Sequence, residues 1–287
     1  MKLAEAKVTI VGMGLMGGSL GKALVQAGAC REVRGLVRRE ESISPILSAK
    51  AAHRADTEPD ALLSDADLLV LSTPVRTIED QATRLSRYLK RTAVLTDLGS
   101  VKGTIVKAME RVPSHVFPVG GHPMCGKEVS GLDAADPDLF RERIWVLTPL
   151  RRTPSSAMSL VQELIEAVGA RRVIMDPETH DAVVACISHL PYLLATVLVA
   201  VAEEVSTRLP GVWTLAASGF RDTSRVAASD VSMMTDILAA NKDHIRAMLD
   251  LAQKRVRFLK ELVETGDFET IERELHLVRT RRSGLFT

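Results

Sequence analysis

Short apolar runs alternate with segments of helical periodicity along the first part of the chain. The apolar runs at 8–11, 32–37, 67–73, 93–97, 116–120, 144–147 and 172–175 predict strands, several of them buried on both faces. Helical patterns lie between them, near 75–89, 101–111 and 154–168. This alternation predicts an α/β fold built on a doubly wound, Rossmann-type, mostly parallel sheet.

The pattern changes near residue 176, because almost everything from 178 to 281 has helical periodicity. We therefore predict a sheet domain over 1–176 and an all-helical domain over 177–287. The segment 178–207 is apolar nearly all round, which predicts burial in a core or against a partner chain. Its most apolar part, 190–202, is interrupted by a proline and is expected to be too short to span a bilayer.

The first apolar run leads directly into Gly12-x-Gly14-x-x-Gly17, and a helical pattern follows. A glycine at each position has a separate physical purpose: Gly12 permits a tight turn, Gly14 lets the backbone approach a pyrophosphate, and Gly17 lets the helix pack against the strand. The helix start at Leu15 and Met16 offers unpaired N–H groups to the phosphates. Strand, glycines and helix in this order predict a dinucleotide-binding domain of 1–176.

The second predicted strand ends about 20 residues after the last of these glycines, where an Asp or Glu usually binds a free ribose 2′-hydroxyl. This chain has Val37 followed by Arg38 and Arg39. Two guanidinium groups suit a 2′-phosphate, so we predict that NADP is favoured and NAD is still used. The alternative is a solvated surface pair. Thr73 and Pro74 follow another strand at the edge where ligands bind, and they are further cofactor candidates.

His122 is the leading candidate for proton transfer. It follows the run 116–120, lies between glycine and proline, and titrates near neutral pH, so it suits taking a proton from a hydroxyl as hydride leaves the same carbon. The alternative is a loop histidine bonded to backbone. Ser100 follows another strand and is expected to orient that imidazole, to contact substrate or to cap a helix.

The helical region supplies His180 and His189, which are nine residues apart and would lie on opposite faces of an ideal helix. Pro191 removes a helical hydrogen bond and should kink the helix nearby, so the spacing alone leaves open whether both histidines line one site. Arg221 and Arg225 are candidate carboxylate-binding groups, with surface salt bridges as the alternative.

Composition narrows the class of protein. The chain has 287 residues, 46% of them hydrophobic, and a net charge of +1, which fits a soluble enzyme and argues against nucleic acid as a partner. Cys30, Cys125 and Cys186 are far apart, so neither a disulfide framework nor a zinc site is indicated. With no long apolar segment at the N-terminus, we expect a cytoplasmic protein without a membrane partner.

Taken together, the motifs resemble the prephenate/arogenate dehydrogenase family of tyrosine biosynthesis. The matching pieces follow the family order at 12–19, 96–102, 121–126, 180–181, 187–191 and 218–225. The resemblance implies that His122 is the catalytic base, that Ser100 assists it and that Arg225 binds a substrate carboxylate. It places four further residues at the substrate: His180, His189, Tyr192 and Gly219.

The resemblance also implies a reaction and an assembly. The substrate would be prephenate, arogenate or both, a cyclohexadienol that is oxidised by hydride transfer and loses CO₂. No metal is required, because the developing carbonyl accepts the electron pair of the breaking bond. The helical domain would pair two chains into a homodimer.

The sequence departs from the family pattern in three places. Val37, Arg38 and Arg39 replace the acidic ribose-binding residue, which puts NAD preference in doubt. Tyr192 stands where many prephenate-specific members have a histidine, and Met234 where many have a tryptophan, so arogenate or both substrates stay open.

Three other classes of protein are compatible with parts of the pattern. A dehydrogenase of an amino-substituted prephenate would differ only in the ring substituent. A 3-hydroxyacid dehydrogenase would use a catalytic lysine, for which Lys242 is the one candidate. A non-catalytic NADP-sensing regulator would be expected to lack His122 and Arg225, which are both present.

Overall fold

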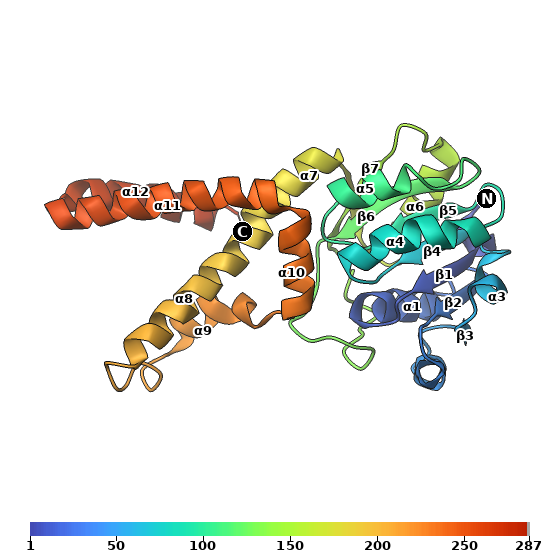
Figure 1. Ribbon diagram of the computed structural model, residues 1–287, viewed down its shortest axis with the longest axis horizontal. Helices are drawn as coiled ribbons and strands as arrows, with labels where there is room; N and C mark the ends of the chain where they lie inside the picture. The colour runs from blue at the N-terminus through green and yellow to red at the C-terminus, as the bar shows by residue number, and fades with distance from the viewer. Residues whose placement is uncertain (286–287) are drawn as a thin grey trace. The chain divides into compact units, whose positions relative to one another are not determined.

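The structure is a computed structural model that describes residues 1–285. The chain divides into two compact units, Met1–Lys242 and Asp243–Thr287, and each is described by itself. The first unit contains an eight-stranded sheet of order β3-β2-β1-β4-β5-β6-β7-β8 (Figure 1). Its paired strands are parallel except β6 and β7, so the predicted doubly wound, mostly parallel sheet is confirmed.

The strands are β1 Lys7–Val11, β2 Glu32–Leu36, β3 Arg54–Asp56, β4 Leu68–Leu71, β5 Val94–Asp97, β6 Phe117–Pro123, β7 Ile144–Pro149 and β8 Arg171–Ile174. The helices of the first unit are α1 Leu15–Ala27, α2 Ile43–Ser48, α3 Pro59–Leu63, α4 Val75–Leu85, α5 Gly103–Met109, α6 Ser155–Ala167, α7 Pro177–Val184, α8 Leu190–Ser206, α9 Ser218–Ser224 and α10 Val231–Ala240. Short 3₁₀ segments are η1 Leu3–Glu5, η2 Glu40–Ser42, η3 Ser86–Tyr88 and η5 Arg225–Ala228, and η4 Ala185–His189 is a π-helical turn.

The sheet is buried on both faces because its central strands are apolar at successive positions. Leu68 and Val70 of β4 belong to the hydrophobic cluster that includes α1 and α6. Leu69 and Leu71 belong to the cluster that includes α4 and α5 on the opposite face. Side chains alternate between the faces of a strand, so a continuous apolar run satisfies both helical layers.

Strand β6 is longer than the sequence pattern predicts. The run 116–120 predicted a strand that ends before His122, but β6 continues to Pro123. The cause is antiparallel pairing with β7, in which Gly121 lies opposite Leu147 and His122 opposite Val146. The predicted end of the strand at residue 120 was therefore wrong, and so is the alternative of a loop histidine: His122 is fixed by the sheet near the carboxyl end of β6.

Glycines let helix α1 approach its neighbours closely. A Cβ atom at Gly17 would lie 2.0 Å from the carbonyl oxygen of Gly12, and one at Gly21 would lie 2.0 Å from the carbonyl oxygen of Ala51. Both distances are far inside van der Waals contact with backbone atoms. The packing role predicted for Gly17 therefore has a direct steric basis.

Helical structure continues without interruption from Pro177 to Ser206 through α7, η4 and α8. By length and composition alone this run is long enough to cross a membrane, although its most apolar part, 190–202, was expected to be too short by itself. Its first half is held in the first unit by hydrogen-bonded polar side chains, because His180, Asp181 and His189 are all buried. Such groups are costly in a lipid environment, so the run by itself is weak support for a membrane span.

The second unit contains α11 Lys242–Thr265 and α12 Phe268–Ser283. The chain turns between them at Gly266, whose φ of +73° lies in the left-handed region, and the Asp267 side chain caps α12 by accepting from Thr270 N at 3.1 Å. Many apolar side chains of these helices are exposed: Leu249, Leu251, Val256, Leu259, Val263, Phe268, Leu275, Leu277 and Val278.

The close approach at Gly21 yields a stability prediction. Gly21→Ala should lower the free energy of unfolding by about 1–3 kcal/mol, because the new methyl group forces α1 away from Ala51. Urea denaturation measures the change. Gln26→Ala, at an exposed position of the same helix, is the matched control, and equal stability of the two variants would contradict the packing argument.

Candidate active site

The turn between β1 and α1 has the geometry of an anion-binding loop. Gly12 has φ +87°, and a Cβ atom there would lie 2.7 Å from the carbonyl oxygen of Ser72. A Cβ atom at Gly14 would meet open space, which leaves room for a ligand to approach the backbone. The N–H groups of Leu15 and Met16 begin the helix, where intrahelical acceptors are lacking. These residues fit a dinucleotide pyrophosphate.

A cavity of about 610 Å³ in the first unit brings several of the predicted residues together. Gly14, Leu15 and Met16 lie on one wall, and Thr73 and Pro74 lie on the next strand exit. Ser100, the segment 127–130 and residues of η5 and α10 complete the lining. Strand exits therefore form a shared cleft at the carboxyl edge of the sheet, as open α/β sheets require for ligand binding.

Arg38 and Arg39 lie apart from this cavity, directly after β2. Both are exposed, and Arg39 forms a loose ion pair with Glu41 at 3.8 Å. Val37 N donates to the carbonyl oxygen of Asp56 at 3.0 Å, which holds the chain in place just before the two arginines. The guanidinium groups are therefore accessible at the end of β2.

His122 is part of a buried hydrogen-bonded chain. Its Nδ1 lies 2.8 Å from His180 Nε2, and His180 Nδ1 lies 2.7 Å from a carboxylate oxygen of Asp181. The two imidazole rings meet edge to face, with an interplanar angle of 73°. These hydrogen bonds connect β6 to α7 at the start of the helical region, so β6 and α7 together orient the His122 ring.

Asp181 is also the cap of helix α5. Its carboxylate accepts the backbone N–H groups of Lys102 and Gly103, both at 2.7 Å. Burial raises the pKa of this carboxyl, but the hydrogen bonds from His180 and from the two backbone groups lower it below its usual value overall. The alternative in which Ser100 caps this helix is wrong, because the N-cap residue is Lys102 and Asp181 supplies the acceptor. Ser100 instead lines the cavity.

The π-helical turn η4 explains how His180 and His189 reach the same region. Nine residues of ideal helix would place them about half a turn apart, but one extra residue in a π turn reduces the difference to about 80°. His189 Nδ1 lies 3.2 Å from Asn241 Nδ2, and the same Nδ2 donates to the carbonyl oxygen of Asp181 at 2.8 Å. Both histidines therefore connect to Asp181.

Burial keeps His122 and His189 neutral at neutral pH. It lowers the pKa of His122 well below its usual value, and the Coulombic effect of the neighbouring basic groups His180, Lys102 and His189 lowers it further. Burial also lowers the pKa of His189 to about 4. A neutral His122 is the form that accepts a proton.

A buried ion pair holds the backbone on both sides of this cluster. Lys102 Nζ pairs with Asp97 and donates to the carbonyl oxygen of Gly121 at 2.6 Å, and both charged side chains are fully buried. The Asp97 carboxylate also accepts the N–H groups of Gly99 at 2.8 Å and Gly121 at 2.9 Å. It thereby fixes the backbone directly before Ser100 and His122.

The remaining substrate-binding candidates are more exposed. Arg225 lies in η5 and forms an ion pair with Glu128, which lines the cavity. Tyr192 is half-buried and packs against the core cluster beneath α4 and α5. Gly219 lies in α9, and a Cβ atom there would meet no heavy atom within 4 Å. Arg225 is thus linked to the cavity wall through Glu128, whereas Gly219 lies on an exposed part of its helix.

Sequence reasoning missed several residues that organise the site. Asp97 and Lys102 flank Ser100, and their position in the 96–102 motif was a usable signal. Asn241 is buried beside His189 although it lies 52 residues away in sequence, and no pattern pointed to it. Glu128 lies in a polar loop where an ion pair has no local signature.

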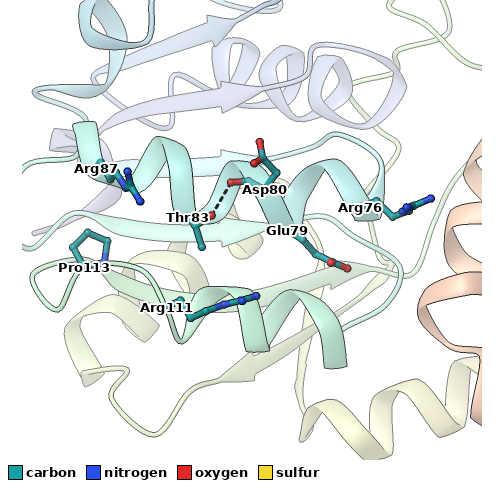
Figure 2. A pocket seen from close by; sticks show the side chains of 7 residues that line it. All are labelled: Arg76, Glu79, Asp80, Thr83, Arg87, Arg111 and Pro113. Atoms are coloured by element: carbon teal, nitrogen blue, oxygen red, sulfur yellow. Dashed lines mark hydrogen bonds between the residues drawn. The ribbon is translucent and has the colours of Figure 1, made fainter.

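A second hollow, of about 670 Å³, lies between α4 and the end of α5 (Figure 2). Its lining mixes charges of both signs, with Arg76, Glu79 and Asp80 on α4 and Arg111 facing that helix. Gly14, Thr73, Pro74 and Ser100 line the cavity of about 610 Å³ but not this hollow, and His122, His180 and His189 are in neither lining. We therefore assign the candidate active site to the carboxyl edge of the sheet and not to this larger hollow.

Comparison with known families agrees with this geometry. The model of the prephenate dehydrogenase nucleotide-binding domain matches residues 20–174, and the model of the prephenate dehydrogenase dimerization domain matches residues 176–277. The chain belongs to the prephenate dehydrogenase family. The two matches meet close to the change of pattern at 176, where the domain boundary remains our proposal.

Relatives within the prephenate dehydrogenase family are similar over almost the whole chain. Prephenate dehydrogenase of Bacillus subtilis is 31% identical over 99% of this chain and 77% of its own length. The crystal structure of Aquifex aeolicus prephenate dehydrogenase with hydroxyphenyl propionate and NAD+ has a TM-score of 0.90 at 33% identity, covering 99% of this chain and all of that one. Synechocystis arogenate dehydrogenase has a TM-score of 0.83 at 28% identity, covering 97% and 99%.

The buried ion pair gives a prediction for the stability of this family member. Lys102→Met should lower the free energy of unfolding by about 3–5 kcal/mol, because it leaves the Asp97 carboxylate buried without its cation. Chemical denaturation of Lys102→Met, Asp97→Asn and the double variant forms a double-mutant cycle. The double variant should be more stable than the sum of the single changes implies; simple additivity would show that the pair is not coupled.

Proposed function

We propose that this chain catalyses the oxidative decarboxylation of prephenate, arogenate or both, giving 4-hydroxyphenylpyruvate or tyrosine. The observation that carries the proposal is the buried, neutral His122, held by His180 and Asp181 at the carboxyl edge of a dinucleotide-binding sheet. Family membership supports the same reaction. A bound nicotinamide dinucleotide supplies the hydride acceptor.

The residues of the site account for the other steps. His122 Nε2 takes the proton of the substrate hydroxyl as the carbon bearing it is oxidised to a carbonyl. The bond to the ring carboxylate then breaks, CO₂ leaves, and the electron pair of that bond makes the ring aromatic. The hydrogen-bonded chain from His122 through His180 to the Asp181 carboxylate orients the His122 ring to receive this proton. Arg225 binds the substrate anion in place of Glu128.

The role of His122 is tested by His122→Asn. The variant should still bind cofactor, and kcat should fall by about 10²–10⁴, the usual contribution of general acid–base catalysis. Assays of prephenate and arogenate, each with NAD and NADP, measure the effect and identify the substrate. Near-normal turnover by the variant would remove His122 from the mechanism.

The pH profile gives a second readout of the same group. Because the pKa of His122 lies below its usual value, the neutral base persists as the pH falls through 6.5, and the acidic limb of kcat/KM should lie below that pH. The limb should disappear in His122→Asn. An acidic limb above 6.5 would contradict the neutral, buried state of His122.

For the cofactor, we propose a preference for NADP over NAD. Arg38 and Arg39 are exposed donors at the end of β2, and Val37 offers no side-chain acceptor to a ribose hydroxyl. One charge-assisted hydrogen bond stabilises binding by about 1.5–3 kcal/mol, which is about tenfold or more in affinity. Exposure to solvent and salt reduces this to a preference without exclusivity.

This preference is tested by substitution at the end of β2. Val37→Asp combined with Arg38→Ser should shift the ratio of kcat/KM toward NAD by about tenfold, because it adds an acceptor and removes a donor. Arg31→Ser, which removes an exposed arginine before the other end of β2, is the control. A wild-type enzyme that uses NAD with the higher kcat/KM would overturn the proposal.

We propose further that two chains form a homodimer through the helical region. Val197 and Val201 of α8 are 55% and 53% exposed in the single chain, and the family model that matches 176–277 describes a dimerization domain. Apolar helix faces of this extent are normally covered in obligate oligomers. We propose that the same surface of a second copy of this chain covers the apolar face of α8.

The dimer is tested by light scattering at micromolar concentration, where the wild type should have the mass of two chains. The interface should bury more than about 2,000 Å² in total. Val197→Arg with Val201→Arg should give monomers, because buried unpaired charges oppose association. Tyr88→Arg, at an exposed apolar residue of η3, should leave the dimer intact. A monomeric wild type would contradict the proposal.

A further inference from the structure

In the hydrogen-bonded series His122–His180–Asp181, the Asp181 carboxylate determines which ring nitrogens carry hydrogen. The Asp181 carboxylate receives two backbone N–H groups, from Lys102 and Gly103, so it acts as an acceptor. His180 Nδ1 must therefore donate to it. With its hydrogen on Nδ1, His180 presents a lone pair at Nε2, and we assign the hydrogen of the 2.8 Å contact to His122 Nδ1. The lone pair of neutral His122 is thus on Nε2.

A second series of hydrogen bonds also starts from Asp181 and runs through Asn241 to His189. It places the hydrogen of His189 on the other ring nitrogen. The Asp181 carbonyl oxygen only accepts, which identifies the atom of Asn241 that faces it at 2.8 Å as the NH₂ nitrogen. That nitrogen lies 3.2 Å from His189 Nδ1, which must accept its other N–H. A neutral His189 then carries its hydrogen on Nε2.

We propose that Asp181 and Asn241 are positioning residues that hold His122 and His189 in opposite tautomers, so that the site offers one acceptor nitrogen and one N–H donor. This proposal rests on the proposed function for the use of the two nitrogens: His122 Nε2 receives the hydroxyl proton and His189 Nε2–H binds an anionic oxygen of the substrate. Neither positioning residue needs to touch the substrate.

Burial makes the arrangement specific. Asn241 and His189 are 3% and 1% exposed, so water does not compete for these hydrogen bonds. The titratable groups that act on His122 are His180, Lys102 and His189, and those that act on His189 are Asp181 and His180. Burial is the largest cause that lowers the pKa of both rings, and His180 and Lys102 lower that of His122 further, so both rings keep the neutral form in which a tautomer is defined.

The direct test is nitrogen NMR of the full-length enzyme labelled with ¹⁵N-histidine at pH 7, without substrate. The signals are assigned by comparison with His122→Gln, His180→Gln and His189→Gln. We expect His122 and His180 with the hydrogen on Nδ1 and His189 with the hydrogen on Nε2. A wild-type His122 with the hydrogen on Nε2, or a wild-type His189 with the hydrogen on Nδ1, overturns the proposal.

Asn241→Asp and Asn241→Ala separate positioning from packing. The aspartate has the shape of asparagine but accepts where asparagine donates, so His189 should move its hydrogen to Nδ1 or become doubly protonated, while His122 is unchanged. The alanine removes the donor without adding an acceptor, so His189 Nδ1 is no longer restricted to accepting and the His189 signals should show a mixture of the two tautomers. Identical His189 spectra in the two variants would show a packing role only and overturn the proposal.

Kinetics complete the test. Asn241→Asp should raise the KM of the anionic substrate by about tenfold or more, and more than Asn241→Ala does, with little change in the KM of the cofactor. Equal changes in both KM values would overturn the proposal. If a variant does not fold, the wild-type spectra still decide.

The NMR experiment tests the positioning role, and the turnover assays test the proposed function, so each proposal can be contradicted separately. Tautomers as expected with no turnover of prephenate or arogenate would support the positioning role and defeat the proposed function. Turnover with reversed tautomers would defeat the positioning role alone.

Discussion

The buried carboxylate of Asp181 is the interaction on which the site depends. A buried anion is strongly unfavourable without hydrogen bonds, and this one is compensated by the first N–H groups of α5 and by His180. The N-terminus of α5 needs an acceptor, and the imidazole chain needs a fixed charge. One side chain meets both needs, so the sheet region and α7 are joined at the place where His122 is oriented.

The neighbouring ion pair of Asp97 and Lys102 restrains the backbone of β6. Strand β6 carries Gly120 and Gly121, and a Cβ atom at either would lie less than 3 Å from a neighbouring heavy atom. Glycines allow this close packing but restrict the backbone little by themselves. The contacts of Asp97 and Lys102 with both backbone groups of Gly121 supply the missing restraint. The same lysine lowers the pKa of His122, so one buried charge affects both the position and the protonation of that ring.

The parts of the structure that follow from local pattern were predictable from the sequence. Continuous apolar runs identified the long strands, and the glycine spacing identified the turn after β1. Short β3 and the helices α2 and α3 were not predicted, because three to six residues are too few to show a period. The strand before His122 was predicted to end at residue 120, because the pairing with β7 that extends β6 is not local.

The candidate site was predictable as a set of residues but not as a geometry. The motifs named His122, His180 and His189, yet ideal helical spacing separated the last two. A π turn has no hydrophobic signature, so the correction of that spacing had to come from the structure. The contact of Asn241 with His189 joins helices distant in sequence and leaves no trace in composition. The exposure of Arg38 and Arg39 agrees with either of the interpretations that the sequence left open.

The π turn η4 also determines how the exposed apolar face of α8 is oriented relative to the buried histidine cluster. It stands between His180 and α8, so its extra residue rotates everything that follows by about 100° relative to α7. That rotation brings His189 toward the buried cluster, and it also decides which side of α8 turns Val197 and Val201 outward. Loss of one residue from the turn would rotate both together. The orientation of His189 and the orientation of the apolar face of α8 therefore depend on the same turn. An insertion or deletion in η4 changes both at once.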